Sequence, residues 1–348
     1  MKCVSAQRGL SLVEVMVALA LAMILTLGLT QIFVANSQSF RMAEASSRVQ
    51  ETGRLATGFL AREIRNADYW GCLRDLTNLN STLNDDSAFN VDALMRGLDV
   101  EDGVGAGGSD RLALGGVNGN SDIEVTFQPS QQAANLRVNE SESFNDGDIV
   151  IVTNCKNGDV FEITDVKDAN EVVVHNAGSS TGGVGNSTQK LSTNYNDDPN
   201  GARVFRPRSQ RFYLQDNGGR RELVTDGVNV FGNLSGTGTY SSAVALLEDV
   251  QDFQVQLGVD SNGDDRVDSW EDSDGTAAQA DSAIAIRYSL LIRSPDDNVT
   301  DGGVSYCYPG WLDCESDLTL LTQVAATDTF FYRVYTTTTS LRNRIGGG

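Results

Sequence analysis

Apolar side chains dominate the first part of the chain. Residues 10–35 are almost entirely hydrophobic, and Glu14 is the one charged residue among them. A run of about 25 such residues is long enough to cross a bilayer as a tilted helix. Because Lys2 and Arg8 precede it, the positive-inside rule places the N-terminus in the cytoplasm and the remaining chain across the membrane. The run is too long for a cleaved secretory signal peptide, whose apolar region has about 7–15 residues.

The helical pattern continues beyond the apolar run. Residues 36–68 contain no proline, and their apolar side chains recur roughly at helical spacing, at Val49, Leu55, Phe59, Leu60 and Ile64. A charged stripe of the kind typical of a solvated helix face runs between them, at Arg48, Arg54, Arg62 and Arg65. One continuous helix from residue 10 to about residue 68 would be about 88 Å long. We therefore expect a helical stem whose second half packs on a globular head.

Short alternating or apolar runs bounded by turn residues follow the helix and predict strands. They cover residues 123–127, 148–153, 160–165, 171–175, 203–205, 211–215, 222–225, 250–259, 283–292 and 330–336. Residues 73–122 are predicted as loop with short helices near residues 88–96, and residues 178–187 and 194–200 as exposed loops. The predicted fold class is α+β, with one long N-terminal helix packed on a β-rich head that no linker divides.

Charge excludes one class of partner. The 348 residues carry a formal net charge of −21. Nucleic-acid binding needs clustered Lys and Arg against the phosphates, so we expect no nucleic-acid partner. An acidic, self-repelling surface suits a soluble head and cation binding.

Four of the five cysteines follow the apolar run, at Cys72, Cys155, Cys307 and Cys314. A head outside the cytoplasm would hold them in an oxidising space, where disulfides persist. Four cysteines allow three pairings. Cys307 and Cys314 enclose a short loop, so we pair them and leave Cys72 with Cys155. A zinc site is the alternative, but C-x-x-C pairs are missing and the single histidine is remote in sequence.

The start of the apolar run has a more specific pattern. An ionised carboxylate such as that of Glu14 costs on the order of 2.5–3.5 kcal/mol at mid-bilayer, so it needs a partner. Residues 9–14, Gly-Leu-Ser-Leu-Val-Glu, resemble the class III leader of type IV pilins and pseudopilins. The resemblance implies that a prepilin peptidase cuts after Gly9 and N-methylates Leu10. It also implies that Glu14 pairs with the new α-amino group of a neighbouring subunit. Leu10 departs from the usual Phe, a change that the family tolerates in minor subunits.

Parts of the head resemble one subfamily. Residues 245–255 and 258–260, the helix end at residues 69–72 and the closing residues 336–344 are similar to the PilW family of minor pilins. This resemblance implies a leader over residues 1–9, a transmembrane and filament-core helix over residues 10–35, an amphipathic continuation over residues 36–70 and a periplasmic head over residues 71–348.

The resemblance implies a minor pilin of the inner membrane that joins other minor pilins and the pilus fibre. Its expected role is in a tip complex that primes assembly and supports twitching motility or adhesion. One alternative is a minor pseudopilin of a type II secretion system, which has the same leader. Another is a membrane-tethered calcium-binding adhesin that never polymerises.

The acidic segment at residues 260–271 is a candidate calcium loop. Calcium takes six to eight oxygens, and a twelve-residue loop supplies them from positions 1, 3, 5, 7, 9 and 12. The corresponding ligands are Asp260, Asn262, Asp264, the carbonyl of Arg266, Asp268 and Glu271. Position six, where a tight turn favours Gly, is Asp265. An acidic, solvated hairpin loop is the alternative interpretation.

The single histidine, the Gly-rich segment and the tryptophans do not indicate a catalytic or ligand-binding site. His175 is the only histidine and lacks the partners that a catalytic or metal site needs. The Gly-rich residues 103–108 lie between acidic side chains, which disfavours a phosphate site. We interpret Trp70, Trp270 and Trp311 as packing residues. We expect a substrate of the prepilin peptidase that is not itself an enzyme.

Overall fold

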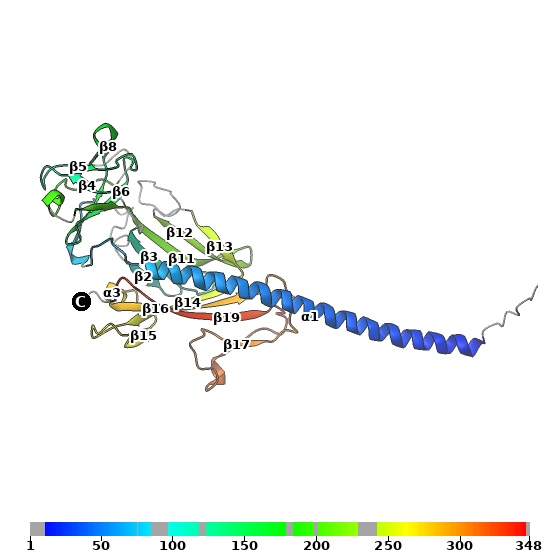
Figure 1. The fold of residues 1–348 in the computed structure, drawn as a ribbon. Coiled ribbons are helices and arrows are strands. Elements are labelled where there is room, and N and C mark those ends of the chain that lie inside the picture. The colour runs from blue at the N-terminus through cyan, green and yellow to red at the C-terminus, as the bar shows by residue number, and fades with distance from the viewer. Residues whose placement is uncertain are drawn as a thin grey trace, which may run out of the picture.

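A single long helix organises the molecule. The computed structural model describes residues 11–74, 76–84, 97–117, 123–178, 184–197, 201–228 and 242–345. Helix α1 spans Leu12–Asn66, and its first buried residue is Ala45. The part before Arg41 extends away from the head as a projecting rod (Figure 1). Among the described residues α1 is the one helix long and apolar enough to cross a membrane. This agrees with the predicted stem.

Two antiparallel sheets form the body of the head beside α1. The first has the order β13-β12-β11-β3-β2, formed by β2 (Leu98–Glu101), β3 (Arg111–Val117), β11 (Pro207–Asn217), β12 (Arg220–Val228) and β13 (Val244–Glu248). The second has the order β15-β14-β16-β19, formed by β14 (Val250–Val259), β15 (Ser269–Glu271), β16 (Ala283–Arg293) and β19 (Tyr332–Ser340). Both contribute apolar side chains to one core with α1, which includes Leu60, Phe212 and Tyr288.

A second group of strands lies at the end of the head farthest from the start of α1 (Figure 1). One sheet has the order β1-β7-β6-β10, formed by β1 (Leu79–Ser81), β6 (Ile149–Thr153), β7 (Gly158–Glu162) and β10 (Arg203–Phe205). The other has the order β4-β5-β9-β8, formed by β4 (Val125–Phe127), β5 (Asn135–Val138), β8 (Asp165–Lys167) and β9 (Val172–Val174). The two sheets enclose a separate core that includes Leu136, Val152 and Phe161.

Smaller elements complete the head. Helix α3 spans Ala277–Ser282, and the pair β17 (Ser305–Cys307) and β18 (Leu321–Gln323) forms a two-stranded ribbon. Every segment predicted as a strand contains one, although residues 160–165 divide between the end of β7 and the start of β8. The predicted α+β class, with a long N-terminal helix and a β-rich head, is confirmed.

The prediction that residues 73–122 form a loop is wrong for part of that range. β1, β2 and β3 lie within it, and β3 is an inner strand of the five-stranded sheet. Leu112 and Leu114 belong to the main core, but two glycines follow and end the pattern after two apolar positions. The strand forms because β2 and β11 supply hydrogen-bond partners on both sides. The helices predicted near residues 88–96 lie outside the described residues.

Two segments predicted as exposed loops hold buried side chains. Asn186 is buried, and its side-chain amide donates to the carbonyl of Glu162 at 2.8 Å. Tyr195 is also buried, and its hydroxyl donates to Oδ2 of Asp159 at 2.6 Å. Long-range hydrogen bonds therefore hold both loops on the second group of strands. The sequence did not predict this burial, because the polar composition of both segments is typical of exposed loops.

Candidate functional site

The first turn of α1 contains the predicted assembly residue Glu14. Ser11 caps the helix, because its hydroxyl accepts from the backbone N–H of Glu14 at 3.2 Å. In return, Oε2 of Glu14 accepts from the backbone N–H of Ser11 at 3.4 Å, which is long for a hydrogen bond. Gly9 and Leu10 lie outside the described residues. The carboxylate of Glu14 is exposed, and among the described residues this long contact is the one hydrogen bond that it accepts.

The projecting half of α1 is an apolar surface that the described head does not cover. Leu12 is 76% exposed and Phe33 is 74% exposed, and the most apolar window of the helix has no buried residue. A soluble monomer rarely leaves a continuous apolar surface of this size in water. A membrane or neighbouring helices must therefore cover it.

Two tyrosines attach the second half of α1 to the head. The hydroxyl of Tyr335 donates to the carbonyl of Val49 at 3.1 Å, and the hydroxyl of Tyr288 donates to the carbonyl of Thr57 at 2.7 Å. Tyr288 is fully buried in the main core, and burial raises its pKa to about 12. It therefore remains a neutral donor at any physiological pH. The second half of α1 is thus held to the head by two side-chain hydrogen bonds as well as by packing.

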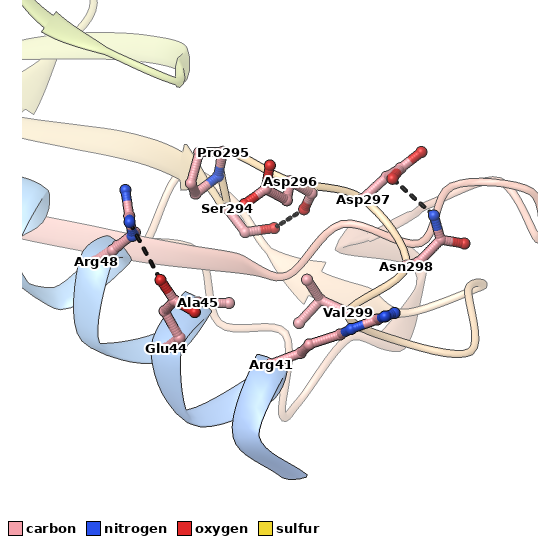
Figure 2. A pocket seen from close by; sticks show the side chains of 10 residues that line it. All are labelled: Arg41, Glu44, Ala45, Arg48, Ser294, Pro295, Asp296, Asp297, Asn298 and Val299. Carbon is pink, nitrogen blue, oxygen red and sulfur yellow. Dashed lines mark hydrogen bonds and ion pairs between the residues drawn. The ribbon is translucent and has the colours of Figure 1, made fainter. Parts of the chain in front are cut away.

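A polar pocket lies where α1 joins the head. It has a volume of about 300 Å³, and Figure 2 shows residues 41–48 of α1 on one side and the loop after β16 on the other. On the helix, a guanidinium nitrogen of Arg48 lies 3.1 Å from Oε1 of Glu44. On the loop, Oγ of Ser294 donates to the carbonyl of Asp296 at 2.8 Å. The lining holds charged groups of both signs, and its one hydroxyl, that of Ser294, donates to a backbone carbonyl and not to a carboxylate.

The closing segment of the chain binds the end of α1, a contact that the sequence did not predict. The side-chain amide of Asn343 donates to the carbonyl of Ala67 at 2.8 Å. The guanidinium of Arg344 pairs with Asp68 and also donates to the carbonyl of Ala283 at 2.9 Å. Both side chains of the ion pair are nearly buried. The C-terminus therefore fixes the point at which the helix enters the head.

Asp68 also binds a residue of the segment that follows α1. Oδ1 of Asp68 accepts from the indole N–H of Trp70 at 2.6 Å, and Trp70 is buried. Two residues later Cys72 forms a disulfide with Cys155, in the turn between β6 and β7. The end of α1 is thereby covalently joined to the second group of strands.

Cys307 and Cys314 form the second disulfide, so both pairs are those predicted from the sequence. Within the loop that they close, the ring of Trp311 lies 5.0 Å from the guanidinium carbon of Arg287. The ring of Trp270 on β15 lies 4.8 Å from the same carbon. Both tryptophans are half-buried packing residues, and Arg287 joins the disulfide loop to β15.

The candidate calcium loop is closed by its own hydrogen bonds. The carboxylate of Asp260 accepts four backbone N–H groups, those of residues 262–265. Asp268 accepts from Ser261 and from the side-chain amide of Asn262. Asp265, at the position where Gly was expected, has a φ of 61° and so adopts the left-handed conformation that this turn requires.

The remaining predicted ligands do not converge in this arrangement. Glu271 accepts from Ser269 and from Gln279. Among the described residues no group of three or more His, Cys, Asp or Glu side chains is arranged to hold a metal ion. Calcium binding by this loop stays a prediction.

His175 is a core residue. It is fully buried, its ring centroid lies 4.6 Å from that of Phe161, and neither ring nitrogen has a hydrogen-bond partner among the described residues. Burial lowers the pKa of His175 to about 4, so the imidazole is neutral near pH 7.

The Gly-rich segment holds a carboxylate of its own. Asp110 accepts from the backbone N–H of Gly103 at 3.0 Å and from that of Val255 at 2.7 Å. Burial raises the pKa of Asp110 to about 7, against these two hydrogen bonds, which favour the ionised form. The backbone N–H groups that an anion would use here already bind a protein carboxylate.

Two family models match the chain. The model of the type IV pilus-assembly protein W matches residues 211–343, from β11 to the closing segment that binds the end of α1. The model of the prokaryotic N-terminal methylation motif matches residues 4–30, which include Gly9, Leu10 and Glu14. No curated protein and no solved structure matches the chain in the same comparisons.

Proposed function

We propose that the chain is a minor pilin that enters the filament by its helix, because residues 211–343 match the model of the type IV pilus-assembly protein W and residues 4–30 match the model of the N-terminal methylation motif. In this proposal a prepilin peptidase removes residues 1–9 and N-methylates Leu10, and the mature subunit leaves the inner membrane by packing α1 among neighbouring helices. There it joins other minor pilins in a tip complex that primes assembly and supports twitching motility or adhesion.

The division of α1 into two halves carries the proposal. From Ala45 onward the helix is built into the head, whereas the preceding part exposes apolar side chains all round. A helix that is apolar on every side belongs in a membrane or among other helices. A minor pilin needs both environments in turn, first the bilayer and then the filament.

Glu14 supplies the preference for the filament. Within the part of the chain that the structure describes, its carboxylate accepts one hydrogen bond, the 3.4 Å contact from the backbone N–H of Ser11. A charged amine from a neighbouring subunit makes a shorter and stronger hydrogen bond than a neutral amide does. Cleavage of the neighbouring subunit by the same peptidase creates such an amine at its new N-terminus, so processing and assembly are linked through this carboxylate.

The disulfides support a periplasmic head with the N-terminus in the cytoplasm. Cys72–Cys155 and Cys307–Cys314 both lie after the apolar segment, and such bonds persist in oxidising compartments. Thiol alkylation of the chain in intact cells checks this. We expect no alkylation of the four cysteines before reduction, and labelling of all four without reductant would contradict a periplasmic head.

The variant Glu14→Ala tests the assembly role. We expect normal membrane insertion and normal trimming, with the variant missing from sheared filaments. Glu14→Gln, which keeps the shape and removes the charge, should behave like Glu14→Ala. Normal incorporation of both variants would refute the mechanism. Mass spectrometry of the mature N-terminus should find a methylated Leu10, whereas an intact Met1 would refute the processing step.

The two alternatives predict different results. A pseudopilin of a type II secretion system would show the same Glu14 dependence, but its loss would impair secretion and leave pili intact. A tethered adhesin would remain in the membrane fraction, with or without Glu14. The match over residues 211–343 favours the pilus over both.

A further inference from the structure

The outward face of α1 in the head carries a concentration of positive charge. The exposed residues of α1 between positions 41 and 65 include two glutamates and five arginines, which are Arg41, Arg48, Arg54, Arg62 and Arg65. Arg41 and Arg48 also line the polar pocket at the edge of this face (Figure 2). The opposite face of the same segment is buried. The chain as a whole has a net charge of −21, so the positive charge of this basic face is opposite in sign to that of the whole chain.

Neighbouring carboxylates neutralise this face only in part. Arg48 pairs with Glu44 at 3.1 Å, an exposed contact that contributes little. Arg62 lies 3.0 Å from Glu63, but that carboxylate is shared with Arg208 at 3.2 Å. Among the residues that the structure describes, the guanidinium groups of three arginines have no ion pair, namely Arg41, Arg54 and Arg65. The basic face therefore retains unbalanced positive charge.

Apolar side chains lie among these arginines. Leu55 is 54% exposed, and half-buried Phe59 lies beneath the guanidinium of Arg62 at 5.2 Å. Arginine and aromatic residues are enriched in protein interfaces, whereas a purely solvated face has no use for an exposed Leu. Figure 1 shows α1 crossing the head with no strand over it in that view. The composition is that of a contact surface.

The direction of the basic face distinguishes a protein partner from a lipid surface. Arg41 and Arg65 are separated by 24 positions, which is about 36 Å along the helix axis. Attraction to a charged membrane falls off within a Debye length of about 8 Å, so a bilayer would reach only the membrane-proximal end. A surface that runs parallel to α1 can engage the whole row. A second copy is disfavoured because two chains with this net charge repel each other.

We propose that the basic face of α1 is the docking surface for an acidic face of a different protein subunit in the filament. This inference rests on the proposed function, since assembly places a neighbouring subunit alongside α1. Carboxylates of the neighbour pair with Arg54 and Arg65, and Leu55 packs between them. The interface thereby sets which subunit lies beside this one, while Glu14 serves assembly of any subunit with a free amine.

Charge reversal tests the docking surface. Arg54→Glu/Arg65→Glu changes two exposed side chains outside the core and keeps good helix-forming residues. We expect about a tenfold or greater loss from sheared filaments, from two lost pairs and added repulsion. Arg54→Lys/Arg65→Lys should retain incorporation. The matched control, Arg137→Glu/Lys190→Glu, makes the same charge change on exposed residues of β5 and of a segment between β9 and β10, and it should have no effect.

Photo-crosslinking identifies the occupant. A benzophenone amino acid in place of Leu55, in the full chain in piliated cells, should give an adduct with another pilus subunit on a peptide that contains Asp or Glu. An adduct with lipid or with a second copy of this chain would overturn the inference.

The two proposals fail in different ways. If the wild-type chain is trimmed and enters filaments, and the double Glu variant enters equally well, only the docking surface is refuted. If the wild-type chain never enters filaments, the proposed function fails and the docking surface fails with it.

Discussion

The ring of Tyr335 on β19 lies directly against Gly53 on α1. A Cβ atom added at Gly53 would lie 2.3 Å from two ring carbons, closer than any real contact. The hydroxyl of the same tyrosine donates to the carbonyl of Val49, one turn earlier. Glycine is favoured here because the ring of Tyr335, held by its hydrogen bond to Val49, lies closer to the helix backbone than a Cβ atom permits.

Gly53→Ala should therefore destabilise the head. We expect a loss of about 1–3 kcal/mol from overpacking, in spite of the higher helix propensity of Ala. Gly58→Ala is the matched control, because Gly58 has open space around its Cβ position and should gain up to about 1 kcal/mol. Denaturant unfolding of the detergent-solubilised chain measures both. Equal effects of the two substitutions would contradict the close contact.

The ion pair between Asp68 and Arg344 should be necessary for a stable head. Asp68→Asn keeps the side-chain shape and tolerates the left-handed backbone of this residue, whose φ is 58°, so it removes mainly the charge. We expect a loss on the order of 3 kcal/mol, because Arg344 remains nearly buried without its partner. The control is Arg342→Ala. Arg342 is exposed, so this substitution should change the free energy of unfolding by less than about 0.5 kcal/mol.

A double-mutant cycle isolates that pair. Arg344→Met combined with Asp68→Asn should be more stable than the sum of the single losses predicts, because neither charge is left unpaired. Strict additivity would show that the two side chains do not interact.

The two disulfides should differ in their effect on stability. Cys72 and Cys155 are 83 positions apart, whereas Cys307 and Cys314 are 7 apart. Loop-closure entropy gives about 4–5 kcal/mol for the longer loop and about 2–3 kcal/mol for the shorter one. We expect Cys72→Ser/Cys155→Ser to lower the unfolding midpoint more than Cys307→Ser/Cys314→Ser does. The reverse order would mean that native-state packing, such as that of Trp311, outweighs chain entropy.

His175 should make the head less stable in acid. Its pKa is about 4 in the folded chain, against 6.5 for an exposed imidazole. The stability that its neutral form provides is fully present above pH 6.5 and is lost as the pH falls through 4, by about 3 kcal/mol in total. His175→Phe removes this dependence and keeps a ring against Phe161. The free energy of unfolding of the variant should fall less between pH 6.5 and pH 4.

The quantity to measure is the difference in the free energy of unfolding between wild type and His175→Phe at each pH. Asp110, whose folded pKa of about 7 lies above its usual value, contributes with the opposite sign over the same range. Its stabilising contribution is present at low pH and is lost as the pH rises through 7. Identical pH slopes of wild type and His175→Phe would refute the assignment to His175.

Calcium binding by residues 260–271 is tested by isothermal titration. A cation would have to compete with the four backbone N–H groups that Asp260 accepts, so we expect weak binding. The heat should be lost in Asp260→Ala/Asp264→Ala. If the wild-type chain releases no more heat on calcium titration than this variant does, the loop does not bind calcium and is a solvated hairpin.

Local sequence determined the stem and its chemistry. The apolar run predicts the helix, and Gly9, Leu10 and Glu14 lie beside it within a few helical turns, so the resemblance to a prepilin leader can be recognised from the sequence. The disulfide pairing also followed from spacing, because Cys307 and Cys314 are too near in sequence to leave other pairs equally favoured.

Tertiary structure alone decided the contacts that hold the helix to the head. β3 became an inner strand because β2 and β11 pair with it, and its own sequence gives only a weak signal. Asp68 meets Arg344 across 276 positions, and Gly53 meets Tyr335 across a similar separation. The arginines of α1 share the exposed side of the helix because packing on the head buries the opposite side. The periodicity of a sequence predicts which side of a helix or strand is apolar. It does not predict which distant residue packs against that side, because this depends on how the long intervening chain folds back.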